Sequence, residues 1–106
     1  MENTVLITIT GISNYYGKKP FKIGRTVKLE KEPDNRHDSD AIVVTLPYID
    51  KIGYVANSIH TVYEGTLSAG RLYEMFEKDA YAQVMVVTSS SVIARLLPDD
   101  EVTDKF

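Results

Sequence analysis

Apolar and polar residues alternate at intervals of two along most of this chain. This spacing predicts half-buried β-strands, because successive side chains of a strand point to opposite faces. Ile7 and Ile9 share one face of "TVLITIT", together with Val5, and Val27 and Leu29 share one face of "RTVKLEK". "AIVVTL" is apolar on both faces, as expected for a central strand. The pattern predicts six strands, over residues 4–10, 25–31, 41–46, 51–55, 80–87 and 92–97.

Between the fourth and fifth predicted strands the spacing changes to that of helices. The first predicted helix runs through "NSIHTVYEG", with Asn57 or Ser58 capping its start and Gly65 ending it. The second runs through "SAGRLYEMFEK", with Ser68 as its N-cap. Apolar residues recur at i, i+3 and i+4 in both: Ile59, Val62 and Tyr63, then Leu72, Met75 and Phe76. We therefore predict a strand-rich α+β fold, a small barrel of about six strands with two short helices inserted between the fourth and fifth strands.

Length and composition indicate one globular domain. The chain has 106 residues, of which 43% are hydrophobic and 25% charged. We expect residues 1–98 to form the domain and residues 99–106, with four acids and one lysine, to be a mobile acidic tail. The chain has no cysteine, and the start "MENTVLITIT" lacks the basic segment of a signal peptide. No stretch reaches 18 apolar residues, so a cytoplasmic protein without membrane contact is the default expectation.

Charge is unevenly distributed along the sequence. The formal net charge of −3 argues against general nucleic-acid binding. Residues 18–36 nevertheless hold seven basic and three acidic residues, a net charge of +4. This basic segment is either a solvated strand face or a surface that contacts phosphates. The residues that would make such contacts are Lys18, Lys19 and Lys22.

Residues for catalysis or metal binding are scarce. The histidines are His37 and His60, and no Gly-x-Ser-x-Gly segment surrounds any serine, so a nucleophile, a base and oxyanion donors are not all present. The polar loop "EPDNRHDSD" is rich in oxygen ligands. A calcium loop beginning at Asp34 would however need glycine and glutamate where this protein has Ser39 and Thr45. We expect no enzymatic activity, no cofactor and no bound metal, and keep a minor metabolic enzyme only as a third hypothesis.

Two segments are suited to contact with nucleic acid. Tyr15 and Tyr16 in "SNYYGKKPF" are consecutive, so both cannot point into one core and at least one ring should be exposed. An exposed aromatic ring beside lysines can stack on a base while the lysines neutralise phosphates. The alternative is one ring in the core and one at its edge. In "SAGR", Arg71 follows Ser68 at a predicted helix start, which is either a second phosphate contact or an ordinary helix cap.

Taken together, "ITGISNYYG", "VKLEKEPDNRHDSDAIVV" and "KIGYV" resemble, in order and spacing, the HIRAN domain. This domain occurs at the N-terminus of fork-remodelling DNA helicases and in small free-standing bacterial proteins. The resemblance covers about the first half of the sequence well, and "GTLSAGRLYEMF" is similar to the bacterial branch. Its most specific part is a pattern made by Glu32, Pro33, Asn35, Asp38, Ala41 and Ile42.

The resemblance implies an OB-like barrel with two helices that binds single-stranded DNA, in helicase members by capturing the 3′ end. By position, Tyr15 and Tyr16 match the aromatic pair that holds the terminal bases. Asp38 matches the acid that meets the 3′-hydroxyl, with Asn35 supporting it, and Tyr54 lines the same pocket. The resemblance also suggests DNA repair, although no helicase is present in this sequence.

The sequence departs from the helicase pattern at three positions. Asn14 stands where helicase members tend to have a basic residue, and Ala56 and Asn57 stand where they carry lysines. Phosphate contacts supply most of the affinity for nucleic acid, so binding should be weak unless Lys18, Lys19, Lys22 or Arg71 substitute. The alternative hypothesis is a protein-interaction domain that holds a peptide, or the carboxyl end of another protein, in the same groove.

Overall fold

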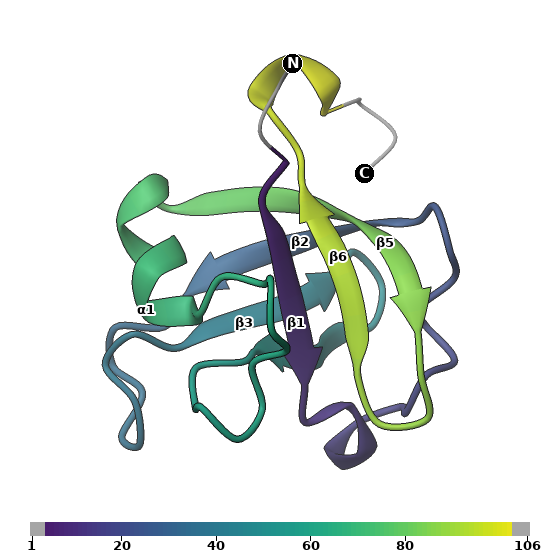
Figure 1. Ribbon diagram of the computed structural model, residues 1–106, viewed down its shortest axis with the longest axis horizontal. Helices are drawn as coiled ribbons and strands as arrows, with labels where there is room; N and C mark the ends of the chain where they lie inside the picture. The colour runs from purple at the N-terminus through teal and green to yellow at the C-terminus, as the bar shows by residue number, and fades with distance from the viewer. Residues whose placement is uncertain (1–3, 103–106) are drawn as a thin grey trace.

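The strands close into a barrel. The computed structural model describes residues 4–102, and within them six strands follow one another around the barrel in the order β1-β4-β3-β2-β5-β6 (Figure 1). Every neighbouring pair is antiparallel. Within these residues closure leaves no open sheet edge, and the predicted strand-rich, OB-like fold class is confirmed. The strands are β1 (Leu6–Thr10), β2 (Thr26–Lys31), β3 (Ile42–Leu46), β4 (Asp50–Val55), β5 (Asp79–Val87) and β6 (Val92–Leu96).

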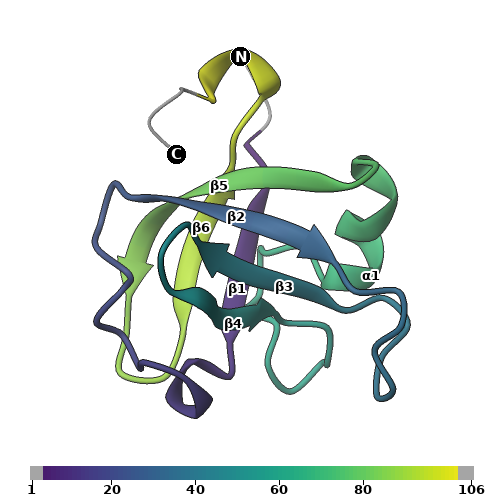
Figure 2. The same cartoon turned by 180° about the vertical axis from the view of Figure 1, so that it is seen from behind.

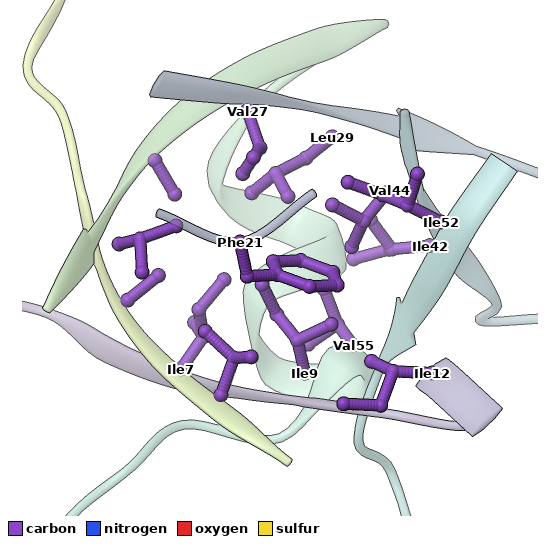
Figure 3. Close-up of a cluster of buried hydrophobic side chains, with 14 of the residues drawn as sticks. Ile7, Ile9, Ile12, Phe21, Val27, Leu29, Ile42, Val44, Ile52 and Val55 are labelled. Carbon is purple, nitrogen blue, oxygen red and sulfur yellow. The ribbon is translucent and has the colours of Figure 1, made fainter. Parts of the chain in front are cut away.

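The interior of the barrel is filled by the residues that the two-residue spacing indicated. Ile7 and Ile9 of β1 and Val27 and Leu29 of β2 are fully buried in one cluster (Figure 3). All five positions of β3 are buried, as expected for a strand that is apolar on both faces. Strand formation was therefore predictable, because the burial pattern and the sequence pattern have the same period.

Phe21 adds a core residue from outside the strands. It lies in the connection between the 3-10 turn η1 (Ile12–Asn14) and β2, and only 3% of its surface is exposed. Its ring occupies the middle of the buried cluster (Figure 3), and its backbone N–H donates to the Lys18 carbonyl at 2.9 Å. No periodic pattern marks Phe21 in the sequence, because it stands alone between two elements. Phe21 anchors the lysine-bearing connection to the barrel.

The first predicted helix is wrong. Residues 58–66 form turns, and Ile59, predicted to face the core, is 91% exposed. The N–H of Val62 donates to the Ser58 carbonyl as in a helix, at 2.9 Å. The next N–H, that of Tyr63, instead donates to Oγ1 of Thr8 in β1, at 3.2 Å. This tertiary bond diverts the donor that would have continued the helix.

The second predicted helix is present but short. It consists of α1 (Ala69–Leu72) followed by the 3-10 turn η2 (Tyr73–Met75). Ser68 is its N-cap, as predicted, and its Oγ accepts from the Arg71 N–H at 3.4 Å. Leu72 is buried, but Met75 is half exposed because the tighter 3-10 turn moves it off the face that the α-helical spacing predicts.

Beyond β6 the backbone makes one further turn, η3 (Asp99–Glu101). Oε1 of Glu101 lies 2.9 Å from Nη2 of Arg95. Residues 103–106 of the predicted acidic tail lie outside the described residues, and the mobility of the tail stays a prediction. No helix within residues 4–102 is long and apolar enough to cross a membrane.

Replacing Phe21 with alanine should destabilise the domain by about 3–5 kcal/mol, because it leaves a ring-sized cavity in the core. Urea unfolding followed by circular dichroism measures this change. Tyr48→Ala is the matched control, since Tyr48 is fully exposed and its removal should change the free energy of unfolding by less than about 0.5 kcal/mol. A Phe21→Ala variant as stable as the wild type would show that Phe21 does not fill the core.

Candidate functional site

An open groove of about 520 Å³ lies where two loops meet β4. The loops, residues 32–41 and 56–67, project from the same end of the barrel as η1, opposite η3 (Figures 1 and 2). We call this hollow the loop-end groove. It brings together four of the five residues that the resemblance implied for DNA binding, and Tyr16 is not in its lining. The lining residues are Tyr15, Asn35, His37, Asp38, Ala41, Tyr54, Val55, Asn57, Ser58 and Thr61.

Asn35 shapes the polar loop from within. Its Oδ1 accepts from the backbone N–H groups of His37 and Asp38, at 2.9 and 3.0 Å. Its Nδ2 donates to Oε1 of Glu32 at 3.0 Å. Such side-chain to backbone bonds are the reason that Asn and Asp concentrate in tight turns. Asn35 therefore holds the loop in shape, and its supporting part in DNA binding stays a prediction.

The Asp38 carboxylate is held by two donors. Its Oδ1 accepts from the Asp40 N–H at 2.9 Å, and its Oδ2 accepts from Nδ2 of Asn57 at 2.8 Å. An ionised carboxylate has about four lone-pair sites, so these two bonds leave acceptor capacity at a side chain that lines the groove. Asp38 thus closes a turn and keeps unused acceptor capacity in the lining of the groove.

Tyr15 and Tyr54 supply the aromatic wall of the groove. Their ring centroids lie 6.4 Å apart and their planes are tilted by 38°. The Tyr54 hydroxyl donates to Oε1 of Glu32 at 2.8 Å. Burial and this bond raise the pKa of Tyr54 to about 12, so the hydroxyl stays protonated and bonded to Glu32 at neutral pH. The ring, rather than the hydroxyl, is the part of Tyr54 available to a ligand.

Glu32 joins the loop to the aromatic wall. Besides Tyr54 and Asn35, it binds Nζ of Lys51 through Oε2 at 3.2 Å. Burial by itself raises the pKa of Glu32, but the hydrogen bonds from Asn35, Tyr54 and Lys51 outweigh it and hold the pKa below its ordinary value of 4.5. Glu32 belongs to the family pattern in the sequence, but its role could not be predicted, because Lys51 and Tyr54 are distant from it in the sequence.

Some basic residues of the segment 18–36 bind other groups of the protein, and others are exposed without an ion pair in the described part of the chain. Arg25 donates to the Pro20 carbonyl, Lys28 forms ion pairs with Asp79 and Glu30, and Lys31 lies over the Tyr73 ring, 4.4 Å from its centroid. The hydrogen bond that Lys28 donates to Asp79 raises the pKa of Lys28. Within residues 4–102, four exposed members of the segment form no ion pair: Lys18, Lys19, Lys22 and Arg36.

Tyr16 and Arg71 lie outside the loop-end groove. Tyr16 follows Tyr15 directly and is 56% exposed, so at least one ring of the pair is exposed, as predicted. Arg71 lines a second groove, of about 460 Å³, which shares Asn57 and Ser58 with the first. These positions leave both residues accessible to a ligand that extends beyond the loop-end groove.

A closed barrel with an open groove of aromatic rings and fixed polar groups defines a small binding domain. The family model of the HIRAN domain matches residues 3–71, and the chain therefore belongs to the HIRAN domain family. The matched part runs from β1 to α1 and contains every residue that lines the loop-end groove. The HIRAN domain is in general a binding domain for single-stranded DNA and is not itself catalytic. Searches of curated proteins and of solved structures found no match.

Glu32→Gln should lower the free energy of unfolding at pH 7 by about 1–3 kcal/mol, because it removes a charged acceptor with three donors. Since the folded-state pKa of Glu32 is depressed, its contribution is present above the unfolded-state value near 4.5 and is lost as the pH falls through the folded-state value. The difference from the wild type should therefore shrink below about pH 4.5.

Urea unfolding of both proteins at pH 7, 5 and 3.5 measures this difference. Glu77→Gln is the control, because Glu77 is exposed and makes no ion pair within residues 4–102. A constant difference between wild type and Glu32→Gln across this range would contradict the role of Glu32 as a charged acceptor held by Asn35, Tyr54 and Lys51.

Proposed function

We propose that the loop-end groove binds the 3′ end of single-stranded DNA. In this proposal the Tyr15 and Tyr54 rings contact the terminal base, and Asp38 accepts a hydrogen bond from the 3′-hydroxyl. The observation that carries the proposal is the Asp38 carboxylate, which two donors fix in a groove walled by two aromatic rings. Membership of a family that binds single-stranded DNA supports the class of ligand.

The chemistry of Asp38 favours a hydroxyl over a phosphate. A carboxylate only accepts hydrogen bonds, and a free 3′-hydroxyl is a donor. A charge-assisted bond between them is stronger than a bond between neutral groups. A 3′-phosphate would place a second negative charge beside the carboxylate. The groove should therefore discriminate between strands by the chemistry of their last sugar.

The other residues predicted from the sequence to bind DNA can contact the nucleotides that precede the 3′ end. The exposed Tyr16 ring can stack on a neighbouring base, and Lys18, Lys19 and Lys22 can neutralise phosphates from the connection that Phe21 anchors. Arg71 is a further phosphate contact for a strand that extends along the second groove. With few such cations and a net charge of −3, affinity should be low and should fall with salt.

The direct test compares two oligonucleotides that differ only in a 3′-hydroxyl or a 3′-phosphate. The wild type should bind the hydroxyl strand about 10- to 100-fold more tightly, as measured by fluorescence anisotropy at fixed salt. Asp38→Ala should remove most of this preference. The control is Asp34→Ala, which removes an exposed acid of the same loop that does not line the groove. Equal affinity of the wild type for the two strands would refute recognition of the 3′ end.

Tyr16→Ala should weaken binding of a single strand by about 1–3 kcal/mol and leave the melting temperature unchanged, because a stacking ring is lost from the surface. Anisotropy and thermal unfolding measure the two quantities. Tyr48→Ala is the matched control, since Tyr48 is exposed but lines neither the loop-end groove nor the second groove. A Tyr16→Ala variant that melts much earlier but binds DNA as before would assign Tyr16 to the fold instead.

A further inference from the structure

Asn57 connects the polar loop to the start of α1. Its Nδ2 donates to Oδ2 of Asp38 at 2.8 Å, and its Oδ1 accepts from the Gly70 N–H at 2.8 Å. One side chain thus bonds a groove acid on one side and a helix backbone on the other. We call these two hydrogen bonds the Asn57 bridge. In the sequence, Asn57 is a candidate helix cap and a position without the lysine of helicase members, and neither feature predicts the bridge.

The bridge fixes which way the Asn57 amide is turned. The Gly70 N–H is only a donor, so the Asn57 oxygen must face α1. The Asn57 NH₂ group must then face Asp38, where it requires an acceptor. An oxygen of the Asp38 carboxyl group supplies this acceptor, so both ends of the Asn57 amide are satisfied.

The backbone around the bridge is itself held in place. The Ala56 N–H donates to the Thr8 carbonyl of β1 at 2.7 Å, and the Ala56 carbonyl accepts from the Ala69 N–H at 2.9 Å. A Cβ at Gly70 would lie only 3.3 Å from Oδ1 of Asn57, so the lack of a side chain lets α1 approach. The backbone on both sides of the bond between Asn57 and Gly70 is therefore held in place by other hydrogen bonds.

We infer that Asn57 is a positioning residue that sets the preference of the groove for a 3′-hydroxyl. This inference rests on the proposed function. Without the bridge, the Asp38 carboxylate keeps only the bond from the Asp40 N–H on Oδ1 and can turn about its last bond. With it, both oxygens have fixed directions, and so have the lone pairs left for a ligand. Asn57 acts through Asp38 and needs no contact with the hydroxyl itself.

Asn57→Ala tests the inference, because the side chain is exposed and its removal leaves the core intact. The preference for the 3′-hydroxyl strand should fall by about three- to tenfold, with little change in affinity for the 3′-phosphate strand. In the free protein the amide resonance of Gly70 should shift, which reports loss of the bridge without any DNA. His60→Ala is the matched control on the same loop and should leave the preference unchanged, since His60 does not line the groove.

The exchange D38N/N57D keeps the hydrogen bonds of the bridge but moves the carboxylate from position 38 to position 57. It keeps the net charge and allows all three hydrogen bonds. The amide introduced at position 38 would donate to the carboxylate introduced at position 57, and that carboxylate would accept from the Gly70 N–H. We expect a Gly70 resonance and a stability close to those of the wild type, but no preference for the 3′-hydroxyl. The single variant Asp38→Asn lacks this balance, since its NH₂ group would face that of Asn57.

The outcomes distinguish the inference from the proposed function. If the wild type prefers the 3′-hydroxyl and Asn57→Ala keeps the full preference although its Gly70 resonance has shifted, the inference is wrong and the proposed function stands. A wild type without preference overturns the proposed function, and the inference with it, before any variant is made. Retention of the full preference in D38N/N57D would show that the preference does not require the carboxylate at position 38, which contradicts the inference.

Discussion

Closure of the barrel through β1 is the constraint on which the loop-end groove depends. β1 pairs with β6 on one side and with β4 on the other, where Thr10 lies opposite Tyr54. The backbone leaves β1 directly into η1, which places the Tyr15 ring beside the Tyr54 ring. The buried Thr8 of the same strand holds the second loop through Oγ1, which binds Oγ1 of Thr66 at 2.8 Å, and through its carbonyl. One strand thus positions both the aromatic wall and the segment that carries Asn57.

The polar loop of residues 32–41 meets two requirements, one for a stable turn and one for ligand binding in the proposed function. A groove acid needs free acceptor capacity, yet an acid on an unconstrained loop would have no fixed direction. Asn35 and Glu32 meet the folding requirement with side-chain bonds inside the loop, so Asp38 needs to give up only part of its capacity. The many Asn and Asp residues of the polar loop therefore have two roles. Some of them build the turn, and Asp38 both builds the turn and faces the groove.

Much of the fold could be predicted from the sequence because burial in a barrel has the period of a strand. The predicted burial of Ile7, Ile9, Val27 and Leu29 follows from this period alone. The first predicted helix is wrong because Thr8, 55 residues before Tyr63, accepts from the N–H group that would have continued the helix. A local sequence pattern carries no information about such a bond.

The candidate site was predictable only in part, for the same reason. Asn35, Asp38, Tyr15 and Tyr54 came from a family pattern, and the structure brings them to one groove. Asn57 could not be recognised, because its role depends on two partners, Asp38 and Gly70, that are distant in the sequence. Phe21 was missed because one apolar residue between elements has no period.

Two-dimensional amide spectra of labelled protein, titrated with a short single strand bearing a 3′-hydroxyl, test the central claim most directly. The account predicts that the shifted resonances cluster on Tyr15, Asp38, Tyr54 and the side-chain NH₂ of Asn57. Shifts confined to another surface, such as the hollow beside Tyr48 and Asp50, would contradict it. An unchanged spectrum at millimolar DNA would contradict it as well.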